Sequence, residues 1–416
     1  MACINKTTGR IIYMDNAATT PLYDEALEAM MPYLKGGFAN PAAIYDIGQE
    51  AAGAVAAARS DIASTLGARP NEIYFTSGGT EADNWAIKGV ALGEYLSHGS
   101  HRRAAGTDRP HIITSAFEHH AVLNTCKWLE KNECRVSYVN PSADGIVPVS
   151  EIESHICKDT VLISVMLANN ETGTIQSVRE IGTLAHEHGI LFHTDAVAAY
   201  GHIPVNVKES NIDLMSASAH KFNGPKGTGF LYVSEEIKLP PFMHGGAQEQ
   251  GRRAGTVNVP GIVGMAAAAV SHHNDMEADI ARLNELGSYF FERLSGLNAS
   301  VLKGSEGLSD MKVSGEKEPG KDAVRINGCI DKRLPGSFNI MIPGVNAEEL
   351  TVRLGMEGIC VSAGAACATY QGDSSHVLKA MGLTKKEADS SIRISLSSAN
   401  TMQEIDILFE FLRGIL

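Results

Sequence analysis

The sequence lacks the features that mark secreted, zinc-binding and membrane-spanning proteins. It has seven cysteines in 416 residues, an odd number, and no two of them form a Cys-x-x-Cys pair. Neither a disulfide framework nor a zinc site is therefore expected, and we predict that most cysteines, Cys360 among them, are small buried side chains. No apolar run is long enough to span a bilayer, and the first residues resemble neither a signal peptide nor a transit peptide. We expect a cytoplasmic protein that does not bind membranes.

Positive charge is also scarce. The chain has 35 Lys and Arg residues against 48 Asp and Glu, a formal net charge of −13, which argues against nucleic acid as a partner. With 44% hydrophobic and 20% charged residues, the composition is typical of a soluble globular enzyme. At this length, two domains are expected rather than one core.

Short apolar strands alternate with helical stretches through the first two thirds of the chain. This alternation predicts an α/β fold with a mostly parallel sheet and helices on both faces. Segments 337–342 and 391–396 alternate like strands of a smaller α+β domain, so we predict a large domain over residues 20–270 and a small domain formed by 1–19 and 271–416. Residues 98–109 and 302–321 are predicted to be surface loops. The strands predicted for the large domain are 72–76, 111–115, 135–139, 161–167, 190–195, 214–218 and 229–233.

The most informative stretch surrounds Lys221, which follows small and hydroxyl-bearing residues and His220, and precedes a Gly-Pro turn. Burial and neighbouring positive charge lower the pKa of a lysine, so a neutral amine can attack an aldehyde such as that of pyridoxal phosphate. A solvated lysine before a turn is the plain alternative. Because that alternative is the more frequent one, the interpretation depends on the rest of the chain.

Two further segments could hold a phosphorylated ring. One apolar run ends at Gly78 and Gly79, followed by Thr80 and a segment with helix-forming residues, an arrangement whose backbone N–H groups and hydroxyl bind phosphate. Another ends at Asp195, at the edge where α/β sheets bind ligands, and an aspartate there can pair with a protonated pyridine nitrogen. Taken alone, an ordinary strand-to-helix turn explains the glycines equally well, and a helix N-cap explains Asp195 better.

Together, in this order and at this spacing, these segments resemble the class V aminotransferase group of pyridoxal-phosphate enzymes, and within it the cysteine desulfurases. The resemblance runs over nearly the whole chain, and its specificity comes from the colinear set rather than from any single motif. It implies pyridoxal-phosphate fold type I, with a large cofactor-binding domain and a small domain. The other segments that carry it are Tyr13 to Pro21, Glu118 to Val122, Asn169 to Gly173, His244 to Thr256, Val361 to Cys367 and Ser390 to Arg393.

The resemblance implies a role for each matched residue. Lys221 would hold pyridoxal 5'-phosphate covalently, and Asp195 would face its ring nitrogen. His119 would stack on the ring and act as acid–base catalyst, and Asn170 would lie near the ring oxygen and the substrate. In the family, a threonine from the neighbouring subunit reaches the phosphate, which implies a homodimer with shared active sites. The phosphate ligands would be Gly79, Thr80, Ser218, His220 and Thr256.

L-cysteine would be the substrate, and Cys367 would receive its sulfur as a persulfide. Cys367 lies among Ser, Ala and Gly residues, which predict an accessible, swinging loop that could reach a sulfur-acceptor or scaffold protein. Arg393 would bind the substrate carboxylate through two parallel hydrogen bonds, with a structural salt bridge as the alternative. For His119 the alternative is a helix cap, and the adjacent His120 is expected to be exposed. No metal site is predicted.

Three positions differ from the residues that the family usually carries. Ala198 stands in place of a glutamine that donates to the ring oxygen, Tyr45 in place of a histidine, and Gln250 in place of an arginine. A hydrogen bond to a charged group is worth roughly 1.5–3 kcal/mol, so these changes leave rate and substrate preference open.

The favoured interpretation is a cysteine desulfurase that supplies sulfur for iron–sulfur clusters or thiolation. A selenocysteine lyase or another β-eliminating lyase is the close alternative. A weakly active paralogue that serves as a sulfur-transfer scaffold is the alternative from another class. The retained set of reactive residues argues against the scaffold; these are Lys221, Asp195, His119, Cys367 and Arg393.

Overall fold

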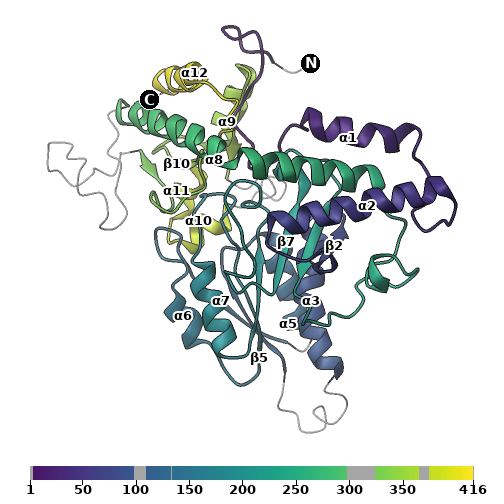
Figure 1. Cartoon of the computed structure of the whole chain (residues 1–416). Helices are drawn as coiled ribbons and strands as arrows, with labels where there is room; N and C mark the ends of the chain where they lie inside the picture. Colours follow the sequence, from purple (N-terminus) through teal and green to yellow (C-terminus); the bar gives the residue numbers. More distant parts are fainter. Residues whose placement is uncertain (1–2, 98–108, 133, 298–323, 365–373, 416) are drawn as a thin grey trace.

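A computed structural model gives the fold of the chain (Figure 1). It describes residues 3–97, 109–132, 134–297, 324–364 and 374–415. The predicted surface loops at 98–109 and 302–321 therefore lie almost entirely outside the described residues, and so does Cys367 with the loop predicted around it.

A seven-stranded sheet forms the centre of the molecule and confirms the predicted α/β architecture. The strand order is β2-β8-β7-β6-β5-β3-β4. β8 is antiparallel to both of its neighbours, and the remaining pairs are parallel. The strands are β2 (Ile73–Thr76), β3 (His111–Ser115), β4 (Arg135–Val139), β5 (Thr160–Ser164), β6 (Leu191–Asp195), β7 (Leu214–Ser218) and β8 (Gly229–Val233).

The predicted strand positions are confirmed, and the end of β5 differs most. The strand stops at Ser164 rather than at Leu167, although the N–H of Leu167 still donates to the carbonyl of Asp195 at 2.9 Å. The chain turns there because Ala168 pairs with Ile175 in an isolated antiparallel bridge. This turn brings residues 166–171 to the carboxyl end of the parallel strands.

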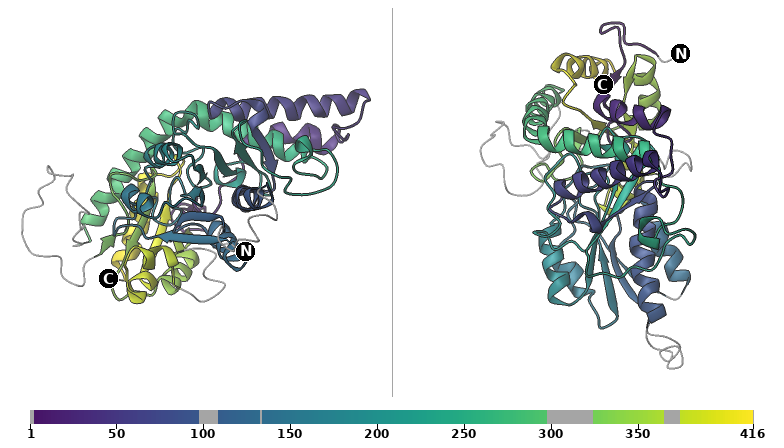
Figure 2. Two further views of the ribbon diagram at one scale, coloured as in Figure 1. Left: turned by 90° about the horizontal axis from the view of Figure 1, so that it is seen from below. Right: turned by 45° about the vertical axis from the view of Figure 1, so that its right-hand side comes forward.

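Helices cover both faces of this sheet (Figure 2). On one face, α3 and α5 pack through Trp85, Val122 and Cys126. On the other face, α2, α7 and α8 contribute to the largest core. These apolar side chains recur at helical spacing, which gives each helix one buried face. The helices are α1 (Asp24–Lys35), α2 (Asp46–Thr65), α3 (Gly79–Ser97), α5 (His120–Lys131), α6 (Val149–Ser154), α7 (Val178–Glu187) and α8 (Val259–Ser295).

A second, four-stranded antiparallel sheet of order β12-β13-β10-β9 forms the C-terminal part. Near it, β1 (Ile12–Tyr13) pairs in parallel with β11 (Ile359–Cys360). The strands are β9 (Arg325–Ile326), β10 (Ser337–Met341), β12 (Ser362–Ala363) and β13 (Ser391–Ser395). The helices are α9 (Ala347–Met356), α10 (His376–Ala380), α11 (Lys385–Asp389) and α12 (Met402–Arg413).

Helix α8 joins two separate hydrophobic cores. Met265, in its first half, packs in the core of the large sheet, whereas Phe290, in its second half, packs with Ile12 and Phe338 in the core of the small sheet. Leu378 of α10 packs in the first of these cores, so the packing does not divide cleanly at residue 270. The predicted domain bounds remain a prediction.

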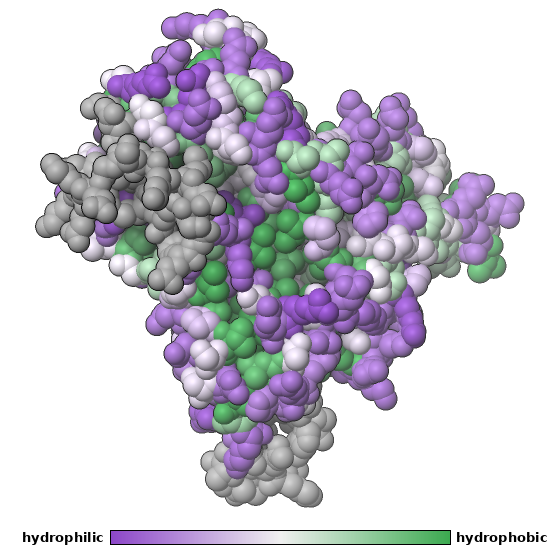
Figure 3. All heavy atoms as spheres, turned by 60° about the vertical axis from the view of Figure 1, so that its left-hand side comes forward, coloured by the Kyte–Doolittle hydropathy of each residue, from purple (hydrophilic) through white to green (hydrophobic). Residues whose placement is uncertain are grey.

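The surface offers two further observations on the sequence-based predictions. On the face drawn in Figure 3, hydrophobic side chains form a band through the middle, between more polar surfaces. Among the described residues, no helix is long and apolar enough to cross a membrane.

The prediction that most cysteines are buried is wrong for the six described, because only Cys126 and Cys134 are buried. Cys360 is half-buried, since its strand β11 pairs on one side only, with β1.

Candidate active site

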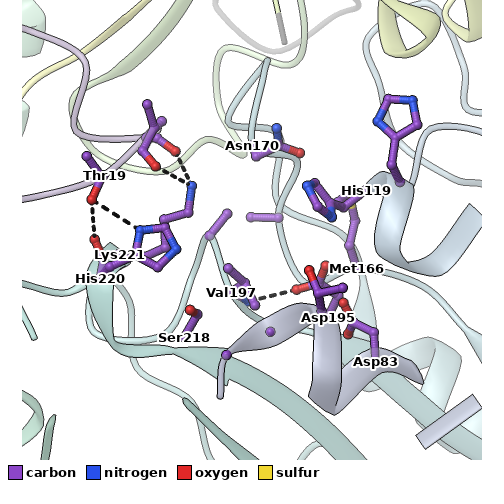
Figure 4. Close-up of a pocket in the computed structure, with 18 of the residues that line it drawn as sticks. Thr19, Asp83, His119, Met166, Asn170, Asp195, Val197, Ser218, His220 and Lys221 are labelled. Carbon is purple, nitrogen blue, oxygen red and sulfur yellow. Dashed lines mark hydrogen bonds between the residues drawn. The ribbon is translucent and has the colours of Figure 1, made fainter. Parts of the chain in front are cut away.

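A cavity of about 550 Å³ lies at the carboxyl ends of the central strands (Figure 4). Three of its walls come from the ends of β6, β7 and the turn after β5, where Asp195, Ser218 and Asn170 lie. His119 enters from the turn after β3, and the N-terminal segment closes one side through Ala18. The sheet edge that the sequence predicted as a ligand site therefore holds a formed cavity.

Lys221 ends a short 3-10 turn, Ala219–Lys221, that directly follows β7. Its side chain points into the cavity (Figure 4), and Nζ donates to the carbonyl oxygens of Ala17 and Ala18 at 2.5 and 3.0 Å. The carbonyl of the preceding residue, His220, accepts from the N–H of Thr20 at 2.9 Å. The N-terminal segment thus fixes the lysine turn, and the alternative of a solvated lysine is wrong.

The glycine turn before α3 faces the same cavity. Gly78 has φ of +148°, a backbone conformation that favours glycine. A Cβ atom at position 79 would lie 2.4 Å from Cγ2 of Val197. Glu81 accepts from the N–H of Ser77 at 2.8 Å and from Arg253 at 2.7 and 2.9 Å. The turn is therefore held open at the start of a helix, where backbone N–H groups attract an anion.

Two of the predicted phosphate ligands lie beside this turn. Ser218 ends β7 and is buried, and its Oγ lies 3.4 Å from where a Cβ of Gly78 would be. His220 shares a hydrogen bond of 3.2 Å between Nδ1 and Oγ1 of Thr19. Burial, reinforced by the charges of Lys221 and Lys226, lowers the pKa of His220 to about 4. A neutral imidazole therefore faces the cavity at neutral pH.

Asp195 lies across the cavity from Lys221 (Figure 4). It ends β6, is 4% exposed, and accepts from the N–H of Val197 at 2.9 Å. Burial raises the pKa of Asp195 to about 6, against the opposing charge of Lys221. Asp195 therefore caps a turn at residues 197–199 and lines the cavity, and the helix N-cap alternative is wrong because no helix follows β6.

His119 combines the two roles that the sequence left open. It is the N-cap of α5, where Nδ1 accepts from the N–H of Ala121 at 3.1 Å, and its ring lines the cavity. Burial lowers the pKa of His119 to about 4, helped by the charges of Lys221 and His120. Since Nδ1 is an acceptor, the neutral ring carries its hydrogen on Nε2.

Arg393 occupies the rim of the cavity on β13 and is 2% exposed. Nη2 donates to Oδ1 of Asp15 at 2.8 Å and to Oγ of Ser362 at 3.2 Å, and Nη1 donates to the carbonyl of Asn170 at 3.1 Å. Its Nε is buried and has no hydrogen-bond partner among the described residues. The structural salt bridge that the sequence left as the alternative is thus present. The guanidinium group uses three of its five N–H donors in these bonds, which leaves the Nε–H and one N–H of Nη1.

Of the predicted site residues, one lies away from this cavity and one is not described by the structure. Thr256 is exposed and does not line the cavity, and Cys367 lies outside the described residues. The expectation that His120 is exposed is wrong, because its ring packs against His376 of α10 at 4.5 Å between centroids. A contact between such distant parts of the chain leaves no local signal in the sequence.

Three acidic residues that line the cavity were missed by the sequence analysis: Asp83, Glu171 and Glu81, whose bonds to Ser77 and Arg253 hold the glycine turn. Asp83, in the first turns of α3, is 1% exposed and lines the cavity beside Asp195. Glu171 is also 1% exposed and accepts from Oγ of Ser375 at 2.6 Å. Asp83 could have been noticed because it lies four residues after Gly79, one helical turn behind the predicted phosphate turn.

We predict that Gly79→Ala destabilises the protein by about 1–3 kcal/mol, the usual cost of forcing an extra carbon into a packed site. The free energy of unfolding in urea measures this. Gly53→Ala in α2 is the matched control, because a Cβ there meets nothing within 4 Å, and it should stabilise slightly. Val197→Ala should restore part of the loss in the double variant; an equal loss with and without Val197 would contradict the clash.

Comparison with known families gives a match over nearly the whole chain. The family model described as aminotransferase class-V matches residues 12–310 and 320–408. The chain is 44% identical over 405 residues to the cysteine desulfurase IscS of Methanosarcina thermophila, covering 97% of this chain and 91% of that protein. It is 42% identical over 407 residues to the cysteine desulfurase IscS of Dictyoglomus turgidum, covering 98% and 95%.

Solved structures agree with this match. A NifS-like protein superposes with a TM-score of 0.83 at 33% identity, covering 97% of this chain and 99% of that one. A structure titled SspA in complex with cysteine superposes with a TM-score of 0.76 at 35% identity, covering 94% and 100%. This chain therefore belongs to the class-V aminotransferase family, among the relatives of the cysteine desulfurases.

Proposed function

We propose that this protein is a pyridoxal-phosphate-dependent cysteine desulfurase, which converts L-cysteine to L-alanine and transfers the sulfur to Cys367. One observation carries the proposal. The amine of Lys221, the carboxyl group of Asp195 and the imidazole of His119 face one cavity, in a chain that is 44% identical to a protein named cysteine desulfurase. Among the open alternatives, the names of these relatives favour the desulfurase over a selenocysteine lyase or a scaffold.

The residues of the cavity fit pyridoxal phosphate. The glycine turn lines the cavity at the start of α3, where backbone N–H groups attract an anion. Asp195 offers a buried carboxylate with one N–H partner for a pyridinium nitrogen. Lys221 would bind the aldehyde between these two ends. When bound, the cofactor supplies the electron sink for the charge left after the substrate loses its α-proton.

The side chains of the site divide the proton transfers. Lys221 is placed to move the proton at the substrate Cα, because its turn is fixed by the N-terminal segment. His119 is neutral above about pH 4, and its Nε2–H can supply the proton that Cβ gains when the C–S bond of the substrate breaks. Lys221 also favours the neutral form of His119, since its charge lowers the histidine pKa.

Substrate recognition rests on Arg393 and Asn170. The buried Nε of Arg393 has no partner among the described residues, whereas both Nη atoms are held by the protein. A carboxylate at the rim would satisfy that donor, at a position fixed by Asp15 and by the carbonyl of Asn170. This differs from the bidentate clamp expected from the sequence, because Nη2 is already bound to Asp15.

The sulfur transfer balances without an external oxidant. The thiolate of Cys367 forms an S–S bond to the substrate sulfur while the C–S bond of cysteine breaks, and Cβ gains a proton to give alanine. The persulfide on Cys367 then passes its outer sulfur to an acceptor or scaffold protein, for iron–sulfur clusters or thiolation, in the cytoplasm. The small residues that surround Cys367 in the sequence suit a group that must reach both partners.

We further propose a homodimer with shared active sites. Apolar side chains are unusually exposed between α1 and α2, where Phe38 is 79% and Ile44 94% exposed. Large exposed apolar patches mark interfaces. Thr256 lies outside its own cavity, but its segment is linked to the glycine turn through Arg253 and Glu81. In such a dimer, Thr256 of one subunit could bind the cofactor phosphate in the cavity of the other subunit.

We predict that Lys221→Ala abolishes covalent cofactor attachment and alanine production from L-cysteine, because no amine remains at the end of β7. Borohydride reduction followed by peptide mapping identifies the attached lysine in the wild type. Lys226→Ala is the matched control, since Lys226 lines the same cavity, and it should keep the attachment. Fixation of the cofactor to Lys226 in the wild type would overturn the assignment.

For Cys367→Ser we expect cofactor binding to remain while sulfide release from L-cysteine is lost. Selenocysteine can still react, because its better leaving group needs less help from a thiolate. Mass spectrometry after incubation with cysteine should locate the persulfide on Cys367 in the wild type. A persulfide found instead on Cys126 or Cys360 would disprove the proposed acceptor, and equal loss with both substrates would point to damage elsewhere in the site.

The shared site can be tested by mixing subunits. Thr256→Ala should weaken phosphate binding by the value of a charged hydrogen bond, roughly 10- to 150-fold. In a mixed dimer of Lys221→Ala and Thr256→Ala subunits, one site receives both lesions and the other receives neither. Tight cofactor binding and alanine production should therefore return at one site per mixed dimer. If Thr256 acted within its own subunit, mixing would restore neither property.

A further inference from the structure

Asp83 is a second buried carboxyl group directly beside Asp195. It reaches the cavity from α3, is 1% exposed, and its Oδ1 has no hydrogen-bond partner among the described residues. Oxygen atoms of Asp83 and Asp195 and a ring nitrogen of His119 all lie within 4.8 Å of one another. Figure 4 shows Asp83 just behind Asp195 in the cavity wall.

In the part of the chain that the structure describes, His193 is the basic side chain within ion-pair distance of Asp83, and it is neutral. Nε2 of His193 lies 3.6 Å from Oδ1 of Asp83, but both ring nitrogens of His193 are already bonded, to Ser164 at 2.8 Å and to Ser216 at 3.0 Å. Burial lowers the pKa of His193 to about 3. His193 is therefore neutral and does not form an ion pair with Asp83.

Two carboxylates at this separation in a buried site repel each other, and both also lose their hydration. We propose that Asp83 is a positioning residue that holds a proton, so that the wall of the cavity carries a single negative charge, on Asp195. This goes beyond the proposed function, and its benefit for the cofactor rests on the proposed role of Asp195. A lone anion at Asp195 then faces the ring nitrogen, with a neutral carboxylic acid behind it.

The environment of Asp83 supports the location of the proton. Burial is the main cause that raises the pKa of Asp83 well above its usual value, and the charge of Asp195 raises it further. A hydrogen bond from Ser216 lowers this pKa, but the two larger causes outweigh it. Asp195 has a pKa of about 6 and is the easier of the two to ionise. Other titratable groups that act on the pair come from α5 and the turn before it, from β6 and from the turn after β7: Glu118, His119, Cys126, His193 and Lys221.

The proposal fixes the sign of a pH effect on stability. A carboxyl group whose pKa is raised in the folded protein binds more protons there than in the unfolded chain. Its contribution to stability is complete below the unfolded pKa and is lost as pH rises through the folded pKa. The wild-type protein therefore loses folding stability as pH rises, because Asp83 must ionise in a buried site. Asp83→Asn, which mimics the protonated acid, should remove this loss of stability.

The test compares thermal unfolding of the cofactor-loaded wild type and Asp83→Asn from about pH 5 to about pH 8. The difference in Tm, variant minus wild type, should rise by a few degrees over this range. Titration of the cofactor occurs in both proteins and cancels in the difference. The variant should also keep its cofactor dissociation constant within about threefold of the wild type. Asp61→Asn, at an exposed position of α2, should give a difference that does not change with pH.

A difference that is flat or falls with pH would overturn the proposal, because Asp83 would then be ionised in the folded protein. Cofactor binding weakened tenfold or more in a folded Asp83→Asn would overturn it as well. If the variant does not fold, infrared spectra of the wild type and of Glu118→Gln at about pH 7.5 replace the unfolding comparison as the test. They show whether a carboxyl group other than Glu118 is protonated. A carboxylic-acid band in both supports a protonated Asp83, and its absence from both contradicts it. None of these measurements depends on enzymatic turnover, so their results can be interpreted even if cysteine is not the substrate.

Discussion

The N-terminal segment from Ile12 to Thr20 is the constraint on which the rest of the site depends. It pairs with the C-terminal part through β1 and β11, and Asp15 binds Arg393 at 2.8 Å. Five residues on, Thr20 donates to the turn that carries Lys221. One short segment therefore sets the position of Arg393 relative to Lys221, although Arg393 lies on β13 of the small sheet and Lys221 follows β7 of the large sheet.

Burial of ionisable groups is the second property that organises the site. In water, the side chains of Asp83, His119 and Asp195 would titrate independently, but in the cavity wall each loses hydration and favours its neutral form. The pKa of His119 falls to about 4, and that of Asp195 rises to about 6. The protein thus offers a neutral imidazole and one easily ionised carboxyl group, which is the charge arrangement that a pyridinium ring requires.

Much of this arrangement could be predicted from the sequence because its parts are local. Gly79, Asp195 and Lys221 each lie within a few residues of a strand end, and a strand, a turn and a helix are encoded by neighbouring residues. Since parallel strands place their carboxyl ends at one edge, three local patterns were enough to predict one site. The seven strands of the sheet followed from the same kind of pattern.

The parts that the sequence did not predict all depend on contacts between distant residues. Asp15 and Ser362 both accept from Nη2 of Arg393, so the arginine does not offer both Nη groups to a ligand as two parallel donors. His120 packs on His376, whose helix α10 belongs to the core of the large sheet rather than to that of the small one. Asp83 is buried where α3 packs on the sheet, close to His193 and Asp195 of β6. In each case, a residue type of ordinary surface character gains its role from what the fold places opposite it, and that information is not carried by any single stretch of chain.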